Sequence, residues 1–285
     1  VYTYVEVANG AGVPAVTALH MRVAKVVSGA STLGAITMLK APVTSYGTGS
    51  GANIYGANNT LLGKALAPIA TTAYGNTIVG DTQCAELSTG YENVVIGAAT
   101  PVLNTGYHNV VIGKGSGAAL TTSQYNVLIG HEAGAANSTI LNGIVAIGYS
   151  AARHSTGVQI TAIGQSAGGA NTTGFRWTAI GDGAGSTATA SDWTAVGSAA
   201  TTGTQGISIG SYAGYNTTGA GNISIGYNAG RTSASDVYST ESVSIGLAAS
   251  YNSIRNYGSI AIGATAGSGT VANHKSTNDS YAIYI

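Results

Sequence analysis

The sequence predicts an all-β chain: a parallel β-solenoid (β-roll) of about 13 coils. Three observations lead to this prediction. A glycine recurs in phase about every 17 residues, a branched aliphatic residue precedes each of these glycines, and turns rich in threonine and glycine separate the copies. A period of about 17 residues is too short for a helix pair and too long for a heptad. It fits two short strands and two turns, which is one coil of a solenoid.

The repeat glycine is called position 0 here, and its neighbours are numbered from it. Thirteen copies span 200 residues in twelve steps, a mean of about 16.7 residues. Internal repeats at a fixed period are the signature of solenoid architectures. The repeat glycines are Gly63, Gly80, Gly97, Gly113, Gly130, Gly148, Gly164, Gly181, Gly197, Gly210, Gly226, Gly246 and Gly263.

Each glycine ends a short strand. Position −1 is Leu, Val or Ile in every copy, and position −3 is Thr, Val or Ile in every copy. Two residues that lie two apart share one face of a strand, so the sequence predicts that these positions form the core. The isoleucines predicted to form the core are Ile96, Ile112, Ile129, Ile147, Ile163, Ile180, Ile209, Ile225, Ile245 and Ile262.

Position −2 lies between the two predicted core positions and points to the other face. It is apolar or tiny in every copy, and it changes from residues such as Leu61 and Val95 to Ala162 and Ser224 along the chain. A face of this kind is not typical of a solvated surface. We therefore expect position −2 to pack against neighbouring chains, which approach more closely toward the C-terminal end.

The repeat divides the chain into three parts. Residues 1–46 lack it and are expected to be a non-repeat β segment that serves as an attachment or linker. Residues 47–267 are the predicted solenoid, and residues 268–285 are expected to form a terminal strand.

The composition excludes several classes of function. Charged residues are 7% of the chain, against roughly 25% in an average globular protein. Ten basic and ten acidic side chains cancel, so no net field attracts nucleic acid. The five histidines have no metal-ligand spacing and a single cysteine cannot form an intramolecular disulfide. We expect no enzyme activity, cofactor or metal, and no membrane insertion, since no run of 18 apolar residues occurs.

Aromatic residues supply the candidate binding site. Trp177 and Trp193 both occupy position −4 and lie 16 residues apart, so they should stack in successive coils, with Arg176 and Asp192 just before them. If they are exposed, such rings could hold a sugar, and if not, they would seal a seam between chains. The remaining candidates are tyrosines in the turns: Tyr212, Tyr215 and Tyr227.

The repeat with its flanks, as in residues 91–97 (YENVVIG) and 222–230 (NISIGYNAG), resembles two related families. One is the head of the YadA-type trimeric autotransporter adhesins, and the other is the Gly-rich Asn-x-x-Ile-Gly-x-x-Ala-Gly repeat of bacteriophage tail fibres. The longer period and the Thr-Gly turns favour the phage fibre. The resemblance implies a homotrimer at a virion or bacterial surface, with a cell-surface glycan or protein receptor as its partner.

Two other functions stay open. A structural extracellular filament without a specific ligand would have the same repeat. An ice-binding solenoid is disfavoured, because an ice-binding face needs Thr-x-Thr on a strand, whereas here the paired threonines are adjacent and lie in turns.

Overall fold

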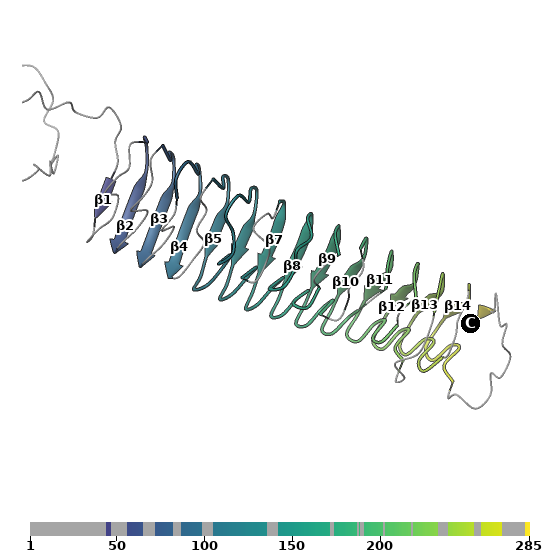
Figure 1. Cartoon of the computed structure of the whole chain (residues 1–285). Coiled ribbons are helices and arrows are strands. Elements are labelled where there is room, and N and C mark those ends of the chain that lie inside the picture. Colours follow the sequence, from purple (N-terminus) through teal and green to yellow (C-terminus); the bar gives the residue numbers. More distant parts are fainter. Residues whose placement is uncertain are drawn as a thin grey trace, which may run out of the picture. The chain divides into compact units, whose positions relative to one another are not determined.

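The computed structural model of the chain is a parallel β-solenoid (Figure 1). It describes residues 44–46, 56–64, 72–81, 87–98, 105–135, 142–171, 174–186, 188, 191–201, 203–217, 219–232, 239–253, 258–269 and 283–285. The described residues are all-β and contain no helix. Apart from residues 44–46, the predicted N-terminal segment lies outside the described residues, as does most of the predicted C-terminal segment.

Short strands follow one another at the repeat spacing, and each contains or directly precedes a repeat glycine from β2 to β14. Their bounds are β1 Thr44–Tyr46, β2 Thr60–Lys64, β3 Thr77–Asp81, β4 Val94–Ala98, β5 Val110–Ile112, β6 Val127–Ile129, β7 Ile144–Ile147, β8 Ile160–Ile163, β9 Trp177–Ile180, β10 Thr194–Val196, β11 Ile207–Ile209, β12 Ile223–Ile225, β13 Val243–Ile245, β14 Ile260–Ile262 and β15 Ile283–Tyr284.

The strands form one parallel sheet in sequence order, from β1 to β15. Equivalent repeat positions pair with each other, so that Ile112 lies opposite Ile129 and Gly80 opposite Gly97. This register means that every repeat position forms a column along the solenoid, as the stacked arrows in Figure 1 show. The sheet already includes β1, which lies before the predicted start of the solenoid at residue 47.

The prediction of which strand face forms the core is wrong. Position −2 is buried in all thirteen strands from β2 to β14, whereas no residue at position −1 or −3 is buried. Five of the ten predicted core isoleucines are exposed, with Ile163 at 37% and Ile262 at 45%, and the other five are half-buried. The core of the solenoid therefore holds Leu61, Val111, Ala162 and their equivalents, and the isoleucines face outward.

The period alone could not decide between the two faces, because both are apolar. The change from large to small residues at position −2 has a cause inside the coil instead of between chains. In four of the five coils where position −2 is alanine, position −4 is large and buried: Ile144 accompanies Ala146, for example, and Trp177 accompanies Ala179. The exception is Ala261, which follows Ser259. Protein interiors are close-packed, so a gain in volume at one position matches a loss at the other.

The repeat glycines are required by the close stacking of coils. Gly164 has a φ of +130°, and a Cβ placed on it would stand 2.5 Å from the carbonyl oxygen of Gly181 in the next coil. No side chain fits that space, and the backbone angle is one that L-residues rarely adopt. The column of glycines thus holds successive coils at the spacing of a β-sheet.

Candidate functional site

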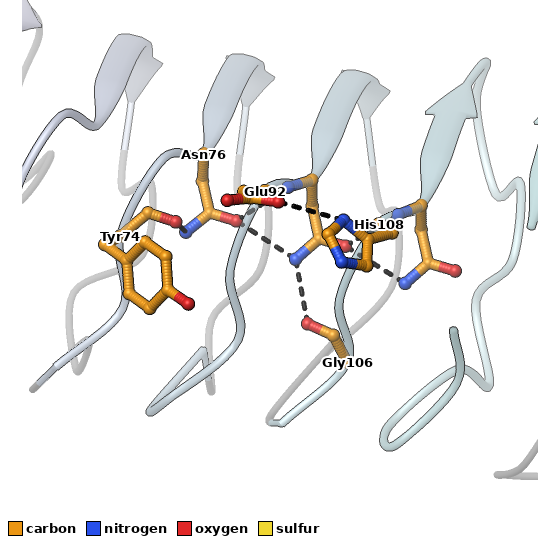
Figure 2. Close-up of polar contacts among 7 residues, drawn as sticks. Tyr74, Asn76, Glu92, Gly106 and His108 are labelled. Carbon is orange, nitrogen blue, oxygen red and sulfur yellow. Dashed lines mark hydrogen bonds and ion pairs between the residues drawn. The ribbon is translucent and has the colours of Figure 1, made fainter. Parts of the chain in front are cut away.

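The interior of the first coils is tied together by a column of buried asparagines at position −4. The Asn93 side-chain amide donates to Asn76 Oδ1 at 3.0 Å and to the carbonyl oxygen of Gly106 at 2.8 Å. The backbone N–H of Asn93 also donates to Asn76 Oδ1, and Asn109 repeats both bonds one coil later. Figure 2 shows this column beside the surface residues of the same coils. Position −4 therefore points into the solenoid.

The same geometry overturns the predicted sugar platform. Trp177 and Trp193 do stack, with ring centroids 5.0 Å apart and planes 4° apart, but each is only 2% exposed. A Cβ added at Gly168 would collide with the Trp177 ring, so each indole fills the space that a glycine leaves. The Trp177 indole N–H donates to the carbonyl oxygen of Gly174 at 3.2 Å. A ligand cannot reach either ring, and the two residues belong to the core.

Arg176 and Asp192, which precede the tryptophans, lie outside and form an ion pair. Arg176 Nε and Nη2 donate to the two carboxylate oxygens of Asp192 at 2.5 and 3.0 Å. These hydrogen bonds lower the pKa of Asp192 and raise that of Arg176. The pair joins two adjacent coils on the surface, where a single exposed ion pair contributes little to stability.

The predicted turn tyrosines are accessible. Tyr212 and Tyr215 meet edge to face with ring centroids 5.7 Å apart, and the Arg231 guanidinium lies 4.8 Å from the centre of the Tyr212 ring. Tyr227 is 52% exposed. A positive charge against aromatic rings is a favourable contact, so this group presents both a polar and an apolar surface to solvent.

An aromatic column near the other end of the sheet was missed in the sequence. Tyr74, Tyr91 and Tyr107 occupy position −6 in successive coils, and their rings stack at 4.8 and 4.7 Å. His108 meets Tyr107 edge to face. The His108 Nδ1 group donates to the Glu92 carboxylate at 3.0 Å (Figure 2). Burial is the main cause that raises the pKa of Tyr91. The spacing that singled out the tryptophans could have identified these tyrosines too.

The outward strand face forms a continuous surface feature, here called the apolar stripe and defined as positions −3 and −1 of β2 to β14. None of its 26 side chains carries a charge, and all are Thr, Val, Leu or Ile. At about 4.8 Å per strand and 3.3 Å per residue, the stripe covers roughly 600 Å². The largest apolar patch on a typical monomeric protein is about 300–600 Å², so the stripe is at the upper limit for a free surface.

Polar residues border the apolar stripe on both sides in sequence. Position −5 carries Glu92, Arg176 and Glu241, and position +1 carries Lys64 and Asp182, all exposed. An apolar centre with a polar rim is the usual anatomy of a protein interface.

Within the described residues, no group of three or more His, Cys, Asp or Glu side chains could hold a metal ion. No helix in the same part of the chain is long and apolar enough to cross a membrane. Comparisons of the chain with protein-family models, curated proteins and solved structures gave no match.

Proposed function

We propose that the chain is the repeat shaft of a homotrimeric extracellular fibre of about 13 coils, similar in design to a phage tail fibre. The observation that carries this proposal is the apolar stripe. A continuous uncharged face along thirteen strands is costly in water, at about 25 cal/mol for each Å² of apolar surface. Burying it against copies of the same chain removes that cost along the whole length.

In this proposal the apolar stripe, and not position −2, packs against the neighbouring chains. Both strand faces are apolar, so one lines the solenoid and the other is available to a neighbouring chain. Three copies around an axis would bury the three stripes together, and the charged rims would stay in water. The bacterial adhesin head shares this design and differs in its source, a cell surface instead of a virion.

Association is tested by sedimentation equilibrium of the native chain. A trimer of three 28.0 kDa chains has a mass of 84 kDa, and we expect this mass at micromolar concentration. A stable monomer at the same concentration would contradict the proposal.

Receptor binding is the second part of the proposal. Because Trp177 and Trp193 are buried, the receptor contact must lie at other residues. We assign the contact with a cell-surface glycan or protein to Tyr227, which is exposed, and to Tyr212 and Tyr215, which are half-buried. Binding to a glycan array and to a panel of bacterial cells should decrease in Tyr227→Ala. The matched control is Leu247→Ala, since Leu247 stands at the same repeat position in the next coil and is 57% exposed.

The competing function is a structural filament with no specific ligand. The buried tryptophans favour it, because the largest aromatic side chains serve packing and not recognition. A chain that forms the trimer and yet binds neither the glycans nor the cells would be this filament.

A further inference from the structure

The paired positions −4 and −2 fill the core of the solenoid in most coils, but not near the C-terminal end. Asn126 accompanies Leu128, Ile144 accompanies Ala146, and Trp193 accompanies Ala195, so one large side chain is present each time. In the coils of β11, β13 and β14 both positions are small. There the pairs are Gly206 with Ser208, Ser242 with Ser244, and Ser259 with Ala261.

A cavity lies where this volume is missing. Ten residues line it around β12 and β13, and nine of them carry a hydroxyl or amide side chain, whereas Gly230 has none: Thr217, Asn222, Ser224, Gly230, Thr232, Ser239, Ser242, Ser244, Ser250 and Ser253. Its volume, counted over the positions open to the centre of a water molecule, is about 10 Å³. A site for one water needs roughly 10–15 Å³ on this measure and two to four polar partners.

We propose that this cavity is a binding site for one ordered water molecule in the core of each chain. The lining offers hydroxyl groups that both donate and accept hydrogen bonds, and it carries no charge. An ion would therefore lack a counter-charge, and a larger polar molecule would not fit. Hydroxyls that already donate to a carbonyl oxygen, such as those of Thr217 and Ser253, keep lone pairs that can accept from a water molecule. Water matches the size and the polarity of the site.

The cavity also lies at the base of the longest coil of the repeat, where 20 residues separate Gly226 from Gly246. Thr232 and Ser239 stand on either side of residues 233–238 and both line the cavity. Asn222 fixes the position of Ser239 through two hydrogen bonds. The Asn222 side-chain amide donates to the carbonyl oxygen of Ser239 at 2.5 Å, and Asn222 Oδ1 accepts from Ser239 Oγ at 3.2 Å. The water would extend this network to both ends of the insertion.

Water-oxygen magnetic relaxation dispersion measures long-lived buried water directly. The test variant is Ser242→Ile with Ser244→Ala, which copies the pair Ile144 and Ala146 into β13. We expect one fewer long-lived water per chain and a higher melting temperature. Ser198→Ala, at an exposed serine, is the control and should leave the count unchanged.

An unchanged count in the folded double variant would overturn the proposal. If the double variant fails to fold, a high-resolution crystal structure of the unaltered chain decides. Ordered density within hydrogen-bond distance of Asn222, Ser239 or Ser244 side chains supports the water site, and no density in the cavity refutes it.

Discussion

Two adjacent residues of β8 test which strand face forms the core. Ala162 is fully buried between Ala146 and Ala179 of the neighbouring strands, whereas Ile163 is 37% exposed in the apolar stripe. Changing each to aspartate places the same carboxylate on opposite faces of one strand, one residue apart. The two variants should therefore fail in different ways.

Ala162→Asp should destabilise the fold itself. A buried carboxylate avoids its charge by taking up a proton, and moving its pKa from about 3.9 to 7 costs roughly 4 kcal/mol at 1.36 kcal/mol per pKa unit. The larger side chain adds about 1–3 kcal/mol of overpacking. A total near 5–7 kcal/mol approaches the whole stability of a typical domain, so far-UV circular dichroism should show an unfolded or strongly destabilised chain.

Ile163→Asp should spare the fold and remove association. Its carboxylate stays in water in the single chain, but three copies would meet where stripes pack together, and an unpaired buried charge is costly. Sedimentation velocity should show a folded species of one chain. The reasoning is refuted if Ile163→Asp unfolds while Ala162→Asp remains native, because that result would reverse the two faces.

Three further predictions follow from the interior and the surface. Trp177→Ala should lower the free energy of unfolding by about 3–5 kcal/mol, as measured by denaturant titration. The fraction of the variant that is folded should bind cells as the unaltered chain does. Loss of binding from a fully stable variant would contradict the buried position of Trp177. Asn93→Ala leaves a buried carbonyl and a buried backbone N–H without their partner, which should lower the free energy of unfolding by about 1–3 kcal/mol for each group. A melting temperature equal to that of the unaltered chain would argue against the asparagine column. Carbon-detected NMR should place the pKa of Asp192 below 3.8. The contribution of its ion pair to stability is therefore present above that pH and is lost as the pH falls through the lowered pKa. Arg176→Gln should raise the pKa of Asp192 toward the ordinary value, and an unchanged pKa would mean that the pair is absent in solution.

Much of the fold follows from the sequence because glycine spacing is a one-dimensional signal. The repeat glycines predict strand positions, register and the parallel order, and Gly80 and Gly97 pair as expected. The assignment of faces failed because alternation distinguishes two faces only when one is polar. Here Val95 and Ile96 are both apolar, and the volume exchange between positions −4 and −2 was the available signal for the inner face.

The candidate site was predicted less well, and Trp177 shows why. Position −4 accepts Asn, Ser, Ile and Trp, and such variety is unusual in a core and more typical of an exposed surface. In the first coils the same position holds an asparagine that bonds to its neighbours. In the coils of β9 and β10 it holds a tryptophan that fills the space beside Gly168 or Gly185. The prediction considered position −4 alone. It missed that a large side chain at position −4 is matched by a small one at position −2 in the same coil.

The sequential order of the strands has a mechanical consequence for a fibre. In the part of the chain that the structure describes, each strand pairs only with the strands before and after it, and the bonds between coils run along the direction in which coils stack. A pull along that direction loads the sheet bonds one coil after another, as in a zipper, instead of shearing many at once. Each coil of about 17 residues that detaches releases up to roughly 55 Å of extended chain, so a shaft of this kind would yield in steps and lengthen many times over before a covalent bond carries the load.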